Sequence, residues 1–431
     1  MKMKTLISIF LTFSVICGTI AGCKTSNNDS KLDSSSGQGK TIKVYQMKVE
    51  INDSLQKLVK KYEEETGVKV DVTSVGGGVD YSPALKAEFD KKTEPDIFII
   101  QGTADYELWK NKIDDLTSEP WIKNAVKGTL DMVTVDNKVY GMPAATEGYG
   151  LIYNKDILDK AGIDPNSIDT FDKLKSAFET LDSKKAELGI DNVVSYTTKE
   201  KWVPGIHTFN VPLAMQENPI EFVKKYSEGK ADIVNNKIFN DWMNLVELLC
   251  KYGGGQKMQT IDYSTQVGNF ALCKTAFIQQ GNWIASDLKS LGANFNMGFV
   301  PLCVNNDPKI SGSIPVGVPM YWVVNKDSKV NKEAKEFLNW LDESKTAQEA
   351  LVKDMNIIPA FTNFTVESDD PLNKSISEYN KSGKIISWPI TILQQGFTTE
   401  KIAPLFSEFI ETDMGPKAKK DMLEGIEKAS K

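Results

Sequence analysis

The chain has 431 residues, of which 41% are hydrophobic and 25% are charged, and it carries a formal net charge of −7. At roughly 150 residues per domain, this length predicts two or three domains. The composition is that of an ordinary soluble globular protein and excludes a disordered or multi-spanning membrane chain. Because an acidic protein is repelled by phosphate backbones and anionic lipid surfaces, nucleic-acid binding is also excluded.

The N-terminus differs in composition from the rest of the chain. Lys2 and Lys4 precede an uninterrupted run of low polarity over residues 6–20, and a pair of small residues then leads to Cys23. This order of segments predicts a signal peptide over residues 1–22. A cysteine directly after small residues resembles the bacterial lipobox, and the resemblance implies cleavage before Cys23 and attachment of lipid to its thiol. A plain secretory signal with a coincidental cysteine is the alternative.

Residues 23–40 are almost entirely Ser, Asn, Asp, Gly and Lys. They cannot bury enough apolar surface to offset the entropy of ordering, so we expect a lipidated flexible tether. No other segment reaches the ~20 apolar residues that a membrane span needs. Loss of Lys2 and Lys4 with the signal peptide changes the net charge from −7 to −9. The sequence thus predicts an exported protein on the extracellular face of a bacterial cell membrane, held there by its N-terminal lipid only.

Strand and helix signals alternate after the tether. Strands are predicted at Thr41–Tyr45, Val68–Val72 and Ile97–Ile100, with one helix between them that Ser54 caps and Gly67 ends, and another around Pro83–Phe89. Strands joined in this way by helices form a parallel α/β sheet. Ligands of such sheets bind beyond the carboxyl ends of the strands.

Polar side chains follow each of these three strands. The loops carry Lys48 and Glu50, then Asp80 and Tyr81, then Gln101 and Asp105. Because the carboxyl ends of parallel strands meet at one edge of the sheet, these side chains predict a binding site there. The glycines at 76–78 are not followed by the Gly-Lys-Ser/Thr of a phosphate loop. We expect them to turn the chain tightly or to let its backbone approach a ligand.

The rest of the chain is predicted to be mostly helical. A buried strand over residues 151–153 leads into a helix that Asn154 opens and Gly162 ends. Further helices are predicted at Phe171–Leu188, Ile220–Tyr226, Phe239–Lys251 and Lys332–Leu341, with a short strand at Ala276–Ile278. No internal repeat is visible.

Three residue types limit the chemistry of the site. All 51 basic residues are lysine. Arginine is the preferred bidentate partner of carboxylates and phosphates, so its absence favours a neutral ligand, although a biased base composition of the genome explains it equally well. Cys250, Cys273 and Cys303 are widely spaced and odd in number, which favours buried free thiols, with one disulfide as the alternative. His207 is the only histidine, so any histidine-dependent site would have to use it.

Seven stretches along the mature chain carry a family pattern: GVKVDV, PDIFII, DLTSEPW, VYGMPAATEGYGLIYNKDILDKAGI, FIQQGNW, PVGVPMYWVVNK and EAKEFLNWL. In this order they closely resemble the extracellular solute-binding proteins of carbohydrate ABC importers, the group that includes maltodextrin-binding protein. The resemblance implies an α/β fold of two lobes that close on a ligand like a clamshell and are joined by strands that cross more than once. We expect residues 41–147 and 310–345 to form lobe 1, and residues 148–309 and 346–431 to form lobe 2.

The resemblance also implies site residues. Glu147 falls where the first lobe ends. The resemblance implies that its carboxylate accepts hydrogen bonds from sugar hydroxyls. The alternative is that Glu147 is a solvated charge in a loop. The resemblance further implies contacts from Lys48, Glu50 and Asp105 in the loops and from Trp283 and Trp388 as aromatic platforms. Gln101 and Asp80 are expected beside them from the sheet geometry rather than from a family motif. The remaining expected contacts are Tyr81, Tyr149, Trp202 and His207, and a structural hydrogen-bonding role is the alternative for His207. The axial C–H face of a pyranose is apolar and packs on an indole. Plain core packing is the alternative for each Trp. The family places an aromatic residue directly after the third strand, whereas this chain has QGTADYELW, which leaves the sugar preference open.

The sequence therefore predicts a monomeric lipoprotein that binds a mono- or oligosaccharide and delivers it to an ABC permease with a separate ATPase, without cofactor, metal or catalysis. An exported glycoside hydrolase is the first alternative, because such enzymes also use paired carboxylates. A receptor for another small polar solute, such as a polyamine, a metal or a peptide, is the second. No GxSxG, HExxH or EF-hand spacing appears, and scarce His and Cys argue against transition metals.

Overall fold

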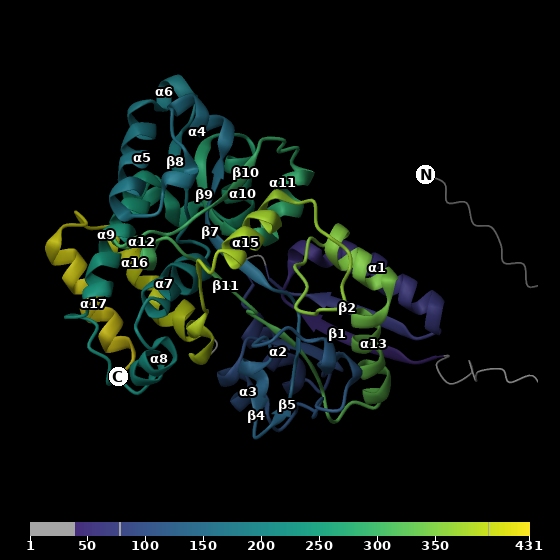
Figure 1. Ribbon diagram of the computed structural model, residues 1–431. Coiled ribbons are helices and arrows are strands. Elements are labelled where there is room, and N and C mark those ends of the chain that lie inside the picture. Colours follow the sequence, from purple (N-terminus) through teal and green to yellow (C-terminus); the bar gives the residue numbers. More distant parts are fainter. Residues whose placement is uncertain (1–38, 77–78, 395) are drawn as a thin grey trace, which may run out of the picture.

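The computed structural model describes residues 39–76, 79–394 and 396–431, which form two lobes (Figure 1). The predicted signal peptide, Cys23, nearly all of the tether and the glycines at 77–78 lie outside the described residues. Among the helices that are described, none is long and apolar enough to cross a membrane.

Lobe 1 is built on a five-stranded sheet in the order β2-β1-β3-β12-β6. Its strands are β1 (Thr41–Gln46), β2 (Lys69–Ser74), β3 (Ile97–Ile100), β12 (Tyr321–Val324) and β6 (Met142–Pro143). β1 runs parallel to β2 and β3, which confirms the predicted parallel sheet, whereas β12 is antiparallel to β3 and β6. Apolar side chains of the sheet pack with the helices α1 (Asn52–Thr66), α2 (Tyr81–Asp90), α3 (Thr103–Trp109) and α13 (Asn331–Glu343).

Of the two predicted ends of α1, the C-terminal end is confirmed and the N-terminal cap is not. Gly67 ends the helix as predicted, in the left-handed conformation (φ 76°) that a residue without a Cβ adopts at little cost. The predicted cap at Ser54 is wrong, because α1 already begins at Asn52. The Ser54 hydroxyl instead donates a hydrogen bond to the carbonyl oxygen of Asp354, 3.2 Å away.

Lobe 2 contains the second sheet, in the order β13-β11-β7-β9-β8, with β10 also paired to β7. Its strands are β7 (Glu147–Asn154), β8 (Asn192–Ser195), β9 (Thr275–Gly281), β10 (Met297–Val300), β11 (Ile314–Gly317) and β13 (Ile385–Ile386). The surrounding α-helices are α4 (Lys155–Ala161), α5 (Phe171–Ser183), α6 (Lys185–Leu188), α7 (Phe209–Ala214), α8 (Pro219–Ser227), α9 (Lys237–Tyr252), α10 (Tyr263–Ala271), α11 (Ala285–Ser290), α12 (Pro308–Ser311), α15 (Pro371–Lys381), α16 (Ala403–Phe409) and α17 (Pro416–Ala429). The π-helix η5 (Val203–Thr208) leads directly into α7.

The junction of β7 and α4 matches the predicted chemistry. The side chain of Asn154 accepts a hydrogen bond from the backbone N–H of Ile157 and so caps α4. Gly162 ends that helix at φ 78°. β7 itself is longer than the predicted strand over residues 151–153, because it pairs with β9, β10 and β11 and extends back to Glu147.

The chain crosses between the lobes three times. The first crossing lies between β6 and β7, the second between β11 and β12, and the third between Phe361, which is in the lobe 1 core, and α15, which packs in lobe 2. We expected lobe 1 to contain residues 310–345. Instead β11 pairs with β7 in the second sheet, and apolar residues between Ala347 and Phe361 pack in the lobe 1 core. Long-range strand pairing and packing thus set the lobe boundaries.

The three cysteines among the described residues, Cys250, Cys273 and Cys303, are free, and Cys250 and Cys303 are buried as expected. The expectation of burial is wrong for Cys273, which is exposed. Cys273 follows α10 with φ at 57°, so it sits in a turn at the helix end rather than on an apolar face. Its sulfur accepts a hydrogen bond from Nδ2 of Asn154, 3.3 Å away.

Candidate functional site

A cavity of about 430 Å³ lies between the lobes, within the roughly 300–1,000 Å³ typical of small-molecule sites. Ten of the twelve predicted ligand contacts line it: Lys48, Glu50, Asp80, Tyr81 and Gln101 from lobe 1, Glu147 at the crossing, and Trp202, His207, Trp283 and Trp388 from lobe 2. The loops after β1, β2 and β3 therefore meet at one edge of the sheet, as their parallel order predicts.

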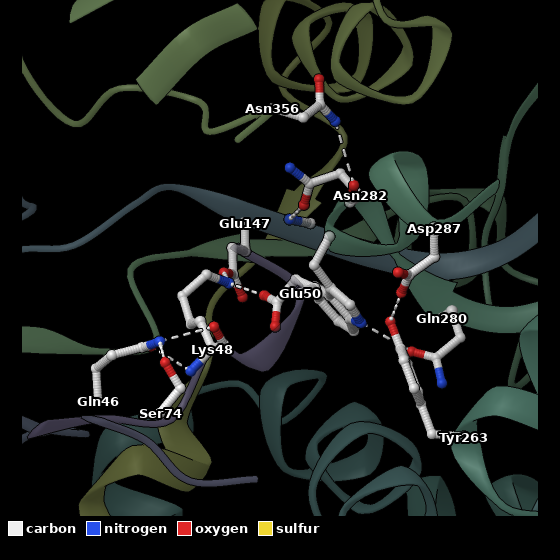
Figure 2. Close-up of polar contacts among 12 residues, drawn as sticks. Gln46, Lys48, Glu50, Ser74, Glu147, Tyr263, Gln280, Asn282, Asp287 and Asn356 are labelled. Carbon is white, nitrogen blue, oxygen red and sulfur yellow. Dashed lines mark hydrogen bonds and ion pairs between the residues drawn. The ribbon is translucent and has the colours of Figure 1, made fainter. Parts of the chain in front are cut away.

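A buried ion cluster forms one wall of the cavity (Figure 2). Nζ of Lys48 lies 2.6 Å from Oε1 of Glu50 and 2.5 Å from Oε1 of Glu147. The exposed fractions of Lys48 and Glu147 are only 6% and 5%. Gln46 holds the loop in place, because its side chain donates to the carbonyl oxygen of Lys48 and to the hydroxyl of Ser74.

Burial and pairing act on these groups in opposite directions. Burial by itself lowers the pKa of Lys48, but the carboxylates of Glu147 and Glu50 outweigh it and hold the pKa above its ordinary value. Lys48 is therefore charged. Burial raises the pKa of Glu147, and Lys48 opposes that rise. The two carboxylates take up two of the three N–H donors of the ammonium group, which leaves capacity toward the cavity.

Aromatic rings of lobe 2 form a second wall of the cavity. The imidazole of His207 lies 5.0 Å from the ring of Trp283, 5.1 Å from that of Trp202 and 5.9 Å from that of Trp388, measured between ring centroids. His207 is 5% exposed, and burial lowers its pKa to about 3. Its ring is therefore neutral at ordinary pH and adds no charge to the aromatic wall.

Hydrogen bonds fix several of these rings. Nε1 of Trp283 donates to Oε1 of Gln280 at 2.9 Å. The hydroxyl of Tyr263 donates to Oδ2 of Asp287 at 2.6 Å (Figure 2). Trp283 also needs Gly281, because a Cβ at that position would lie 2.1 Å from the indole ring. The sequence FIQQGNW thus places a flat indole at the cavity with its nitrogen already bonded.

Two of the predicted contacts do not line the cavity. Tyr149 is completely buried because β7 is an inner strand of its sheet, and its hydroxyl donates to the carbonyl oxygen of His207 at 2.9 Å. Asp105 is buried in α3, where its carboxylate accepts the backbone N–H of Gln101 at 2.8 Å. Both residues support the site from behind, so their predicted role as direct contacts is corrected.

Tyr81 lines the cavity, but its hydroxyl is committed to the sheet. It accepts the backbone N–H of Ile99 at 2.9 Å and lies 3.2 Å from the carbonyl oxygens of Tyr45 and Ile99. Only the ring of Tyr81 is available to a ligand.

Sequence reasoning missed several lining residues. They include Lys199, Glu200, Lys201, Tyr263, Thr391 and Gln394. Glu200 is buried beside the aromatic wall, where it accepts the Nε1–H of Trp202 at 3.2 Å and the backbone N–H of Tyr263. The run Lys199-Glu200-Lys201-Trp202, three charges directly before a Trp, was the available signal.

The described residues contain no group of three or more His, Cys, Asp or Glu side chains that could hold a metal ion. The cavity instead combines a charged, hydrogen-bonding wall with an apolar, aromatic wall. That combination suits a ligand with polar edges and apolar faces.

Comparison with known proteins agrees with this geometry. A family model described as bacterial extracellular solute-binding protein matches residues 57–375. The multiple sugar-binding protein of Streptococcus mutans is 23% identical over 74% of this chain and 75% of its own length, and the melibiose/raffinose/stachyose-binding protein MelE of Bacillus subtilis is 25% identical over 79% and 77%. The solved structure of the solute-binding protein RafE in complex with raffinose superposes with a TM-score of 0.76, at 18% identity, over 90% of this chain and 98% of that one. These similarities confirm the two-lobed fold and the family resemblance, and this chain belongs to the bacterial extracellular solute-binding proteins.

Proposed function

We propose that this protein binds a mono- or oligosaccharide in the cavity between its lobes and delivers it to the permease of an ABC importer. The observation that carries the proposal is the pairing of an aromatic wall around Trp283 with the polar wall of Lys48, Glu50 and Glu147. A pyranose has an apolar face for the indole and a rim of hydroxyls for the carboxylates and the ammonium group. The names of relatives, which mention multiple sugars, melibiose, raffinose and stachyose, support the same class of ligand.

Delivery would follow from closure of the lobes. Glu147 lies where the chain first leaves lobe 1, and Trp283 follows β9 in lobe 2. A ligand that contacts both favours the closed arrangement by the difference between its closed-state and open-state contacts. A permease that recognises only the closed arrangement would then receive only loaded protein. A lipid on Cys23 would keep the protein, as a monomer, beside that permease.

The ion cluster supports binding rather than hydrolysis. A glycoside hydrolase needs a carboxylic acid that donates a proton and a separate carboxylate. Here Glu50 and Glu147 share the same ammonium group, so neither stands apart as the acid. We therefore propose that the protein is not an enzyme.

A thermal-unfolding screen tests the proposal. Raffinose, stachyose, maltotriose and galactose are compared with spermidine and with buffer alone. A bound sugar at about 100 times its Kd stabilises the native state by about 2.7 kcal/mol, which raises the unfolding midpoint. A midpoint that rises only with spermidine would point to a polyamine receptor. Release of shorter saccharides from the bound sugar would favour the hydrolase, and small-angle scattering that shows no compaction at saturation would contradict closure.

A further inference from the structure

One fully buried amide lies behind the aromatic wall without lining the cavity. Asn210 belongs to α7 and has no exposed surface. Its Nδ2 donates to the hydroxyl of Tyr149 and to the carbonyl oxygen of Ser387, both at 3.1 Å, and its Oδ1 accepts the backbone N–H of Ile390 at 3.2 Å. One side chain thus joins three segments that are far apart in the sequence.

Two of these bonds bracket Trp388. Ser387 and Ile390 lie on either side of the Trp388-Pro389 turn, and Asn210 holds one backbone group of each. The indole packs over Gly317, where a Cβ would lie 3.1 Å from Cδ1 of the ring. Trp388 is therefore fixed from behind by Asn210 and from the side by a close approach to the β11 backbone.

The third bond reaches His207 through Tyr149. The hydroxyl of Tyr149 donates to the carbonyl oxygen of His207, and the two rings are stacked, with centroids 4.4 Å apart and planes 18° apart. The ring of Tyr149 also meets Trp388 edge to face at 4.8 Å. His207 lies in the π-helix η5, a type of helix that is rare and concentrated at functional sites. Its Nδ1 has no hydrogen-bond partner in the part of the chain that the structure describes, so neighbouring rings orient it.

We infer that Asn210 is a positioning residue, which sets the shape of the aromatic wall of the cavity. It fixes the position of Tyr149 relative to Trp388, and Tyr149 in turn fixes the position of His207. The class of ligand bound at this wall rests on the proposed function, whereas the hydrogen bonds of Asn210 do not depend on it. Loss of the amide frees both the Trp388 turn and the Tyr149 hydroxyl, so both halves of the wall shift together.

His207 supplies a readout that needs no ligand, because it is the only histidine in the chain. Full-length protein with ¹³C-labelled histidine gives the resonances of a single imidazole. We expect Asn210→Leu, which is similar in size but cannot hydrogen-bond, to displace these resonances, since the stacked ring of Tyr149 moves. Tyr149→Phe keeps the ring and removes only the hydroxyl, and it should displace them in the same direction. This second variant keeps the inference testable if Asn210→Leu does not fold.

Asn325→Leu is the matched control. Asn325 is also a buried asparagine that holds two backbone groups, the carbonyl oxygen of Pro95 and the N–H of Asp327, but it lies in lobe 1 and does not line the cavity. It should lower the unfolding midpoint and leave the imidazole resonances unchanged. Unchanged resonances in both Asn210→Leu and Tyr149→Phe would overturn the inference.

A second arm measures affinity for raffinose, stachyose and maltotriose by calorimetry, well below the unfolding midpoint. Asn210→Leu should weaken binding of whichever sugar the wild type takes by about tenfold, while Asn325→Leu should not. If neither these three sugars nor galactose binds the wild type, the proposed function fails, and the imidazole resonances still decide the role of Asn210. Wild-type affinity in Asn210→Leu would count against that role.

Discussion

Nζ of Lys48 and Oε1 of Glu147 are 2.5 Å apart, although 99 positions separate the two residues in the sequence. Lys48 belongs to the loop after β1, and Glu147 begins β7. Their ion pair therefore joins the cavity-lining edge of lobe 1 to the first crossing into lobe 2. The same ammonium group also pairs with Glu50, so one buried cation faces two carboxylates in the lining of the cavity.

Removal of that ammonium group should destabilise the fold. Lys48→Met leaves the buried Glu147 and the partly buried Glu50 without their cation, and breaking a buried pair in this way costs about 3–5 kcal/mol. The measurement is the free energy of unfolding in urea. Lys417→Met is the control, because the Lys417–Asp421 pair is exposed and should contribute nothing measurable. Equal stability of the two variants would contradict a buried ion cluster.

Glu147→Gln should weaken sugar binding while the protein stays folded. The amide keeps the shape of the side chain but loses the charge in its hydrogen bonds, each worth about 1.5–3 kcal/mol. That range corresponds to a loss of affinity of roughly tenfold to a hundredfold. Calorimetric titration with the sugar found in the screen measures it. Glu65→Gln, on the exposed side of lobe 1, should bind as the wild type does.

Trp283→Ala should lose affinity through lost apolar contact. An indole platform covers on the order of 100 Å² of sugar, or about 2–3 kcal/mol, which is roughly a thirtyfold to hundredfold change in Kd. Trp340→Ala is a matched control, because Trp340 is also half-buried with a bonded Nε1, to Glu65, but packs against Phe337 away from the cavity. If Trp283→Ala binds normally while its unfolding midpoint falls sharply, Trp283 is a core residue.

His207 should make the stability depend on pH. Burial lowers its pKa to about 3 in the folded state, whereas an unfolded histidine titrates near 6.5. Between these values the unfolded chain binds one more proton, so stability falls as the pH falls, by about 1.4 kcal/mol per pH unit. From pH 8 to pH 5 the loss is about 2 kcal/mol.

His207→Phe should remove that part of the slope. The comparison is the difference in unfolding free energy between pH 8 and pH 5 in each protein, which cancels the direct effect of the substitution and the contribution of shared carboxylates. Identical slopes would show that His207 titrates normally in the folded state.

Cys23 should decide where the protein is found. Cys23→Ala removes the thiol of the lipobox-like segment, so the variant should be shed into the medium or remain unprocessed. Cell fractionation with metabolic lipid labelling measures both outcomes, and Cys273→Ala provides a matched control at an exposed thiol. Unchanged membrane retention of Cys23→Ala would refute the anchor.

The local elements were readable from the sequence because their signals are local. Gly67 and Gly162 marked the ends of α1 and α4, and Asn154 marked the start of α4. The parallel order of β1, β2 and β3 followed from helices between strands, and it brought Lys48, Asp80 and Gln101 together at the cavity. Periodicity and turn chemistry depend on neighbours a few positions away, which the sequence displays directly.

Contacts between distant segments were decided only by the tertiary structure. Tyr149 follows Glu147 by two positions on β7, yet Glu147 lines the cavity while Tyr149 is buried behind it among other segments of lobe 2. Glu200 and Tyr263, which are 63 positions apart, are joined beside the cavity by a hydrogen bond, and β11 belongs to lobe 2 because it pairs with β7. No local pattern encodes such pairings, because their free energy comes from burying whole faces of sheets and helices against one another.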